Sequence, residues 1–228
     1  LPPVLPPIEG NPIRVGIIGF GIRGEQLCRS LGFATKDWLQ EMEEAVKADP
    51  NRTDLKDFMN QEKLNVKLVA VCDIFDKRAQ KVIDSFSTQE NPVTRYKTHQ
   101  ELIRSGSVDA VIIATPDHWH ALQTIDAAKN GKDIYCEKPL AHTVNEGIAM
   151  VKAVKKYKRV LQTGSMQRSN PQFHKACELV RNGYIGEIKQ VLVSVGGPPK
   201  PCDLPTEPTP EYLNWNLWLG PAPERGYH

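Results

Sequence analysis

The sequence predicts an α/β protein: a Rossmann domain with a doubly wound parallel sheet, followed by the start of an α+β domain with an open sheet. Three observations indicate this. A glycine-rich turn follows an apolar run near the N-terminus, strand and helix patterns then alternate up to residue 165, and from residue 166 one long helix leads into an apolar stretch with no helix behind it. Strands that alternate with helices pair in parallel through right-handed crossovers.

The glycine-rich turn is the first element. An apolar run over residues 14–18 is typical of a strand buried on both faces, and residues 25–31 have a helical pattern. The turn between them permits a tight bend, a close approach of pyrophosphate to the backbone and close packing of helix on strand. The helix N-terminus adds free N–H groups and a positive dipole end. We therefore predict a dinucleotide site at the G-x-G-x-x-G formed by Gly19, Phe20, Gly21, Ile22, Arg23 and Gly24.

An acidic residue ends the second predicted strand, residues 66–73. Asp73 at that strand tip is expected to accept hydrogen bonds from the adenosine ribose hydroxyls. Its carboxylate also repels a 2′-phosphate, so NAD is favoured over NADP. In a minimal βαβ unit this acid lies about 20 residues after the glycines. Here Asp73 lies much farther from Gly24 along the chain. We therefore predict a helical insertion at about residues 32–64, covering the rim of the domain.

The remaining patterns divide the chain into domains. Residues 1–12 form a proline-rich extended tether, residues 13–165 the dinucleotide-binding domain, and residues 166–228 the incomplete beginning of a second domain. A strand over 187–195 cannot satisfy its backbone alone, so we expect the chain to break off inside that second domain. The other predicted strands are 94–97, 108–114, 133–137 and 160–163, and the predicted helices are 77–85, 99–104, 120–130, 144–157 and 171–181.

Composition excludes several classes of partner. The net charge of +2 over 228 residues gives no reason to expect nucleic acid. No apolar run approaches about 18 residues, so no membrane span is expected. The five cysteines form no C-x-x-C pair, which favours buried thiols and no metal. The proline-rich start lacks the features of a signal peptide. It fits two alternatives, the start of a mature exported protein and an arbitrary cut within a longer chain. Cytoplasmic and exported locations therefore both stay open.

Two further motifs lie at predicted strand ends, where open α/β sheets bind ligands. The first is Thr-Pro-Asp-His-Trp-His over 115–120, and the second is Glu137-Lys138-Pro139. A lysine before proline is held extended, so its amine projects into the crevice. Beside a nicotinamide, that amine would hydrogen-bond a substrate hydroxyl and stabilise negative charge on its oxygen. The alternative is an ordinary surface lysine in a turn.

Together these motifs resemble the Gfo/Idh/MocA family of glucose–fructose oxidoreductase, inositol dehydrogenase and relatives, from about residue 13 to the end. The E-K-P signature of that family carries a catalytic lysine, which implies this role, and substrate contact, for Lys138. Residues 115–120 resemble the T-P-x-x-x-H segment beside the cofactor, and residues 167–171 a stretch where a polar residue and an arginine face nicotinamide and substrate. The resemblance thus adds Thr115, Pro116, His118, His120, Glu137, Lys138 and Gln167 to the cofactor-binding residues, and Arg168 and Trp119 to the substrate-binding residues.

The resemblance also implies a function. It implies an NAD-dependent oxidoreductase acting on a CH–OH group of a sugar, glycoside or polyol, and a homo-oligomer for the full-length protein. The family's catalytic Asp/His pair would lie beyond residue 228, so this chain alone is expected to be inactive. His118 and Trp119 are candidates for the nicotinamide pocket. His120 is expected to cap the next helix or pack under the cofactor rather than act as the base.

Two alternatives stay open. Some relatives are glycoside hydrolases or lyases that retain NAD and act through transient oxidation, and others are non-catalytic dinucleotide-binding regulators. The intact E-K-P segment favours the oxidoreductase over both.

Overall fold

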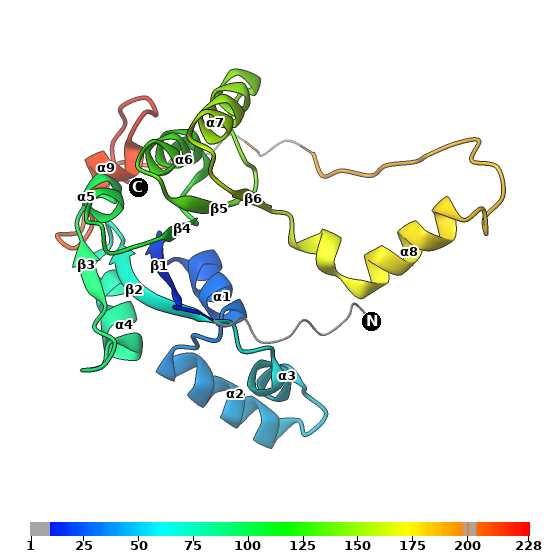
Figure 1. Cartoon of the computed structure of the whole chain (residues 1–228), viewed down its shortest axis with the longest axis horizontal. Coiled ribbons are helices and arrows are strands. Elements are labelled where there is room, and N and C mark those ends of the chain that lie inside the picture. Colours follow the sequence, from blue (N-terminus) through cyan, green and yellow to red (C-terminus); the bar gives the residue numbers. More distant parts are fainter. Residues whose placement is uncertain (1–9, 198–199, 201–203) are drawn as a thin grey trace.

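The computed structural model describes residues 10–197, 200 and 204–228, so most of the proline-rich tether and Cys202 lie outside it. A six-stranded parallel sheet has the order β3-β2-β1-β4-β5-β6, with helices on both faces (Figure 1). This confirms the predicted doubly wound fold. Its strands are β1 (Ile13–Ile18), β2 (Val66–Cys72), β3 (Thr94–Tyr96), β4 (Ala110–Ile113), β5 (Asp133–Glu137) and β6 (Leu161–Gly164).

The helices divide between the two faces of the sheet. Two of them, α1 (Ile22–Ser30) and α4 (Asp76–Phe86), pack on one face, while α5 (His99–Arg104), α6 (His120–Lys129) and α7 (Val144–Tyr157) cover the other. Neighbouring side chains of β1 lie on opposite faces of the sheet, because side chains alternate along a strand. Ile17 packs with α1 and α4, and Ile18 with the other three helices.

The expected insertion contains two helices, α2 (Lys36–Ala48) and α3 (Asp54–Asn60). Trp38 joins them, because its ring meets Phe58 edge-on at 5.3 Å between centroids. The Arg29 guanidinium of α1 lies 4.8 Å from the Trp38 ring centroid. Lys81 of α4 forms a further ion pair with Asp37, at 3.3 Å. The insertion is thereby attached to the α1–α4 face of the domain.

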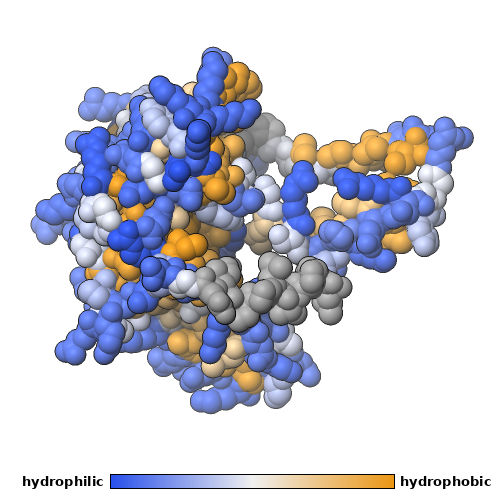
Figure 2. All heavy atoms as spheres, in the orientation of Figure 1, coloured by the Kyte–Doolittle hydropathy of each residue, from blue (hydrophilic) through white to orange (hydrophobic). Residues whose placement is uncertain are grey.

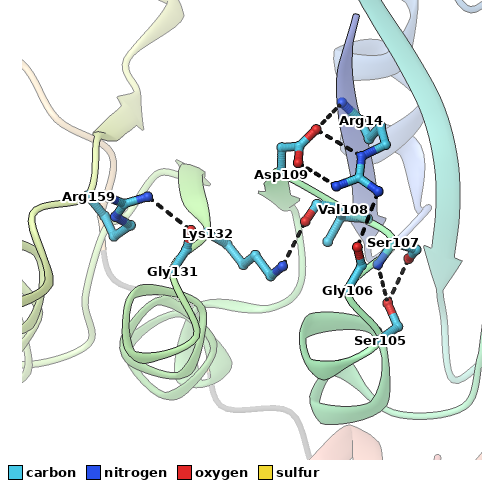
Figure 3. Close-up of polar contacts among 9 residues, drawn as sticks. All are labelled: Arg14, Ser105, Gly106, Ser107, Val108, Asp109, Gly131, Lys132 and Arg159. Carbon is cyan, nitrogen blue, oxygen red and sulfur yellow. Dashed lines mark hydrogen bonds and ion pairs between the residues drawn. The ribbon is translucent and has the colours of Figure 1, made fainter. Parts of the chain in front are cut away.

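The amino-terminal edge of the sheet carries its own polar contacts (Figure 3). The Arg14 guanidinium binds both carboxylate oxygens of Asp109, with Nε at 3.0 Å and Nη2 at 2.7 Å. Lys132 Nζ donates to the Val108 carbonyl at 2.8 Å, and Arg159 donates to the Gly131 carbonyl at 3.0 Å. These bonds tie together the starts of β1, β4 and β5, at the edge opposite the motifs.

This edge gives a pH-dependent prediction. The hydrogen bond from Arg14 lowers the pKa of the Asp109 carboxyl below its usual range. A lowered pKa stabilises the fold above the unfolded pKa of about 3.9, and that contribution is lost as the pH falls further. Asp109→Asn should therefore lower the urea midpoint slightly near neutral pH, since the pair is half-exposed. The difference from wild type should shrink as the pH falls through the lowered pKa of Asp109. A difference independent of pH would contradict this.

Three of the predicted buried thiols are confirmed. Cys28, Cys72 and Cys136 are free and buried, and burial raises the pKa of Cys28 to about 12. For Cys177 the prediction is wrong: its helix α8 (Pro171–Arg181) projects away from the sheet, so the thiol is exposed (Figure 1). Among the described residues, no group of three His, Cys, Asp or Glu side chains could hold a metal ion. No described helix is long and apolar enough to cross a membrane.

The segment after α8 differs from expectation. Residues 187–195 were predicted as a strand, but they pair with no segment in the part of the chain that the structure describes. A strand needs a neighbour to satisfy its N–H and C=O groups. The apolar side chains of this segment, which projects from the sheet together with α8, are consequently exposed (Figure 2). They include Ile188, Val191, Leu192, Val193 and Val195.

The chain then returns to the Rossmann domain. Its last helix, α9 (Trp215–Leu219), lies against the carboxyl edge of the sheet close to α5 and β3 (Figure 1). The sequence patterns did not predict this helix or its position.

Candidate active site at the carboxyl edge of the sheet

The glycine loop has the close contacts that only glycine permits. Gly19 has a φ of 86°, and a Cβ on it would lie 2.9 Å from the Ala114 backbone. A Cβ on Gly24 would lie 2.2 Å from the Gly19 carbonyl oxygen. Gly21 caps α1 without a side-chain hydrogen bond, which leaves the first N–H groups of the helix available to an anion. The loop therefore fits a pyrophosphate.

Asp73 is fixed beside that loop. Its Oδ2 accepts a hydrogen bond from the Phe20 N–H at 2.6 Å, and its Oδ1 accepts one from the Phe75 N–H at 2.8 Å. Burial raises the pKa of the Asp73 carboxyl above its usual range, and the two N–H donors oppose the shift. The Phe20 ring lies in the core against Phe86, so its side chain does not face a ligand. Ile22 is exposed at the start of α1.

A cavity of about 160 Å³ lies between the glycine loop and the ends of β2 and β4. This volume is below the 300–1,000 Å³ of a site for a whole ligand, so the cavity suits part of a dinucleotide. Arg78 reaches it from the first turn of α4, and its guanidinium lies over the Phe75 ring at 5.0 Å. Several lining residues were not predicted to bind the cofactor, because they lie outside the glycine loop and the strand-end motifs: Arg78, Lys97, Gln123, Leu217 and Trp218.

Asp73 gives a prediction on cofactor preference. Asp73→Ser keeps an oxygen at the strand tip but removes the charge that repels a 2′-phosphate, while Arg78 remains. We expect the ratio of NADP to NAD affinity, measured by calorimetry, to rise by about ten- to a hundredfold. Asp84→Ser on the exposed side of α4 is the control and should leave the ratio unchanged. An unchanged ratio in Asp73→Ser would mean that another group sets the preference.

His120 joins two loops of the site. Its ring nitrogens lie 2.8 Å from the Thr115 carbonyl oxygen and 2.8 Å from the Pro139 carbonyl oxygen. The side chain is buried and does not line the cavity. The Thr115 hydroxyl donates to the Gln123 side chain at 2.8 Å, and both residues line the cavity with Pro116. His120 is therefore buried, with both ring nitrogens bonded, and is not accessible as a base.

Glu137 holds the end of β5 in place. It is 3% exposed and accepts a hydrogen bond from Arg23 Nε at 2.7 Å and one from the Lys138 N–H at 3.0 Å. A Cβ on Gly164 of β6 would lie 2.6 Å from the Glu137 carboxylate, so glycine leaves room for this acid. Arg23 and Glu137, both predicted to bind the cofactor, bind each other across the site. The Lys138 side chain that follows is exposed.

His118 and Trp119 contact the C-terminal helix. They belong to a 3₁₀ turn, η1 (Asp117–Trp119), and both face α9. His118 Nε2 lies 2.8 Å from the Trp218 carbonyl oxygen, and Trp119 Nε1 donates to the same oxygen at 3.2 Å. Trp119 also lines the cavity beside Asp73, which Lys138 does not. In this structure α9 holds both side chains, and their place beside the nicotinamide stays a prediction.

The two remaining predicted residues follow β6. Gln167 and Arg168 lie in a second 3₁₀ turn, η2 (Met166–Ser169), and both are exposed. Gly164 at the end of β6 pairs with Glu137 of β5, so η2 starts near the E-K-P segment.

The fold and the loop define the class of protein: a dinucleotide-binding Rossmann domain of the dehydrogenase type. Residues 13–165 match the model of the Gfo/Idh/MocA family, described as an oxidoreductase family with an NAD-binding Rossmann fold. The chain belongs to this family, as its motifs predicted.

Several relatives are inositol dehydrogenases. Inositol 2-dehydrogenase of Rubrobacter xylanophilus is 36% identical over 121 residues, which are 53% of this chain and 33% of that protein. Myo-inositol 2-dehydrogenase of Thermotoga maritima is 31% identical over 137 residues, 60% of this chain and 40% of that protein. The crystal structure of myo-inositol 2-dehydrogenase from Lactobacillus plantarum has a TM-score of 0.60 at 27% identity, over 78% of this chain and 43% of that one. The chain thus spans less than half the length of these relatives.

Proposed function

We propose that this chain is the cofactor-binding part of an NAD-dependent oxidoreductase that acts on a CH–OH group of a sugar, glycoside or polyol. The observation that carries the proposal is Lys138, an exposed amine directly after a buried and ion-paired Glu137. It shares the carboxyl edge of the sheet with the glycine loop and Asp73. The names of the inositol 2-dehydrogenases among the relatives favour a polyol.

Each group then has a role. The glycine loop and the α1 N-terminus bind the pyrophosphate, and Asp73 binds the adenosine ribose. NAD, when bound, supplies the hydride acceptor. Lys138 donates a hydrogen bond to the substrate hydroxyl oxygen and stabilises the negative charge that develops there as a catalytic base takes the hydroxyl proton. Gln167 and Arg168 after β6 contact nicotinamide and substrate. The full-length protein acts as a homo-oligomer.

Net formation of NADH by the full-length protein tests this function. We expect NADH absorbance to rise when the protein is given NAD with at least one member of a panel of inositols, simple sugars and glycosides. Cleavage of a glycoside without net NADH would overturn the proposal and favour the hydrolase that retains its NAD. NAD binding with no turnover of any panel member would favour the non-catalytic regulator.

A further inference from the structure

We propose that the segment of residues 212–220, the C-terminal cover, completes the adenosine subsite of the dinucleotide site and slows the release of the bound cofactor. This inference rests on the proposed function only in that it assumes dinucleotide binding. It assigns a binding role to Leu217 and Trp218, which lie far along the chain from every cofactor motif.

The C-terminal cover contacts the chain just after Asp73, the proposed ribose-binding acid. Leu213 forms an antiparallel bridge with Phe75, two residues after Asp73. The Asp76 N–H donates to the Tyr212 carbonyl at 2.9 Å, and the Phe75 and Tyr212 rings meet edge-on with centroids 4.9 Å apart. The segment that follows β2 is therefore held by the cover through backbone and aromatic contacts.

A second attachment lies at the end of β4. The Trp218 carbonyl oxygen is the shared partner of His118 and Trp119. Gly220, with a φ of 52°, lies so close to Trp119 that a Cβ would be 2.3 Å from its ring. The cover thus spans the mouth of the site from the tip of β2 to the tip of β4, on either side of β1 and its glycine loop.

The cavity between these attachments has the chemistry of an adenosine subsite. Leu217 and Trp218 form one wall, and the glycine loop with Asp73 and Thr115 forms the other. Apolar and aromatic walls suit a planar base, and the Asp73 carboxylate suits ribose hydroxyls. Lys138, at the proposed nicotinamide end, is outside this cavity. α9 therefore covers one side of a bound adenosine, and loss of these contacts on release slows dissociation.

The test compares two changes in the cover with matched controls. Trp218→Ala removes part of the wall, and Gly220→Ala forces α9 away from Trp119. In stopped-flow displacement of NADH by excess NAD, both should raise the dissociation rate constant by about tenfold, the size expected for loss of an aromatic wall against a base. Trp218→Phe keeps an aromatic wall, so its dissociation rate constant should stay close to that of wild type. Gly183→Ala also substitutes a glycine of positive φ, 77°, but with no atom within 4 Å of its Cβ, and it should release NADH like wild type.

A second readout locates the contact along the cofactor. ADP-ribose affinity should fall in Trp218→Ala by the same factor as NADH affinity, because both ligands carry the adenosine half. Unchanged dissociation in Trp218→Ala, with a wild-type circular dichroism spectrum, would overturn the inference. If Gly220→Ala does not fold, the inference is tested by comparing the NADH dissociation rate constants of Trp218→Ala and Trp218→Phe. Absence of NADH binding by wild type would instead defeat the proposed function.

Discussion

Replacing Gly24 by alanine is expected to lower NAD affinity by on the order of a hundredfold or more, because it displaces the phosphate loop. The added Cβ would lie 2.2 Å from the Gly19 carbonyl oxygen, and both atoms belong to the backbone. No side-chain rotation relieves such a contact, so α1 has to move away from β1. That movement separates the α1 N-terminus from Gly19, and the pyrophosphate loses its aligned N–H groups.

Calorimetry with NAD on the purified chain measures the loss, and the urea midpoint measures the cost to stability, which overpacking sets at about 1–3 kcal/mol. Gly32→Ala is the control. It has a φ of 93° and no atom within 4 Å of its Cβ, so it brings backbone strain without a clash. It should bind NAD like wild type. Wild-type affinity in Gly24→Ala would show that the loop does not bind the pyrophosphate.

The sequence predicted the Rossmann fold well because its signals are local. Ile17 and Ile18 on β1 are both buried, one on each face, and such a continuous apolar run marks a central parallel strand. The glycine loop and Asp73 were found for a similar reason: their roles depend on backbone position at a strand end, which a short motif specifies.

The side-chain partners of the site were not predictable in the same way. Arg23 pairs with Glu137 across 114 residues of sequence, and His118 faces Trp218 across 100. These contacts arise only when the sheet order and α9 bring distant segments together. The prediction of a strand over residues 187–195 was wrong for a related reason. An apolar run forms a strand only beside a pairing segment, and no described segment pairs with these residues.

Replacing Lys138 by alanine is expected to lower kcat/KM of the full-length protein for its polyol by about 10²–10³-fold, the cost of removing one donor to a developing oxyanion. The effect should fall on kcat, because the hydrogen bond strengthens as charge develops on the substrate oxygen. NAD affinity should change much less than kcat, since Lys138 lies outside the cavity proposed for the adenosine half of the cofactor. Steady-state rates of NADH formation and calorimetry with NAD measure the two quantities.

The position of Lys138 makes this prediction specific. Its backbone N–H is bound by Glu137, and Arg23 fixes that carboxylate at 2.7 Å, so truncating the lysine leaves its anchor intact. Lys152→Ala on the exposed side of α7 removes an equivalent charge outside the site and should retain wild-type kcat. A fall below about threefold in Lys138→Ala, under 1 kcal/mol of transition-state stabilisation, would mean that Lys138 is only a surface residue and that another group polarises the substrate hydroxyl.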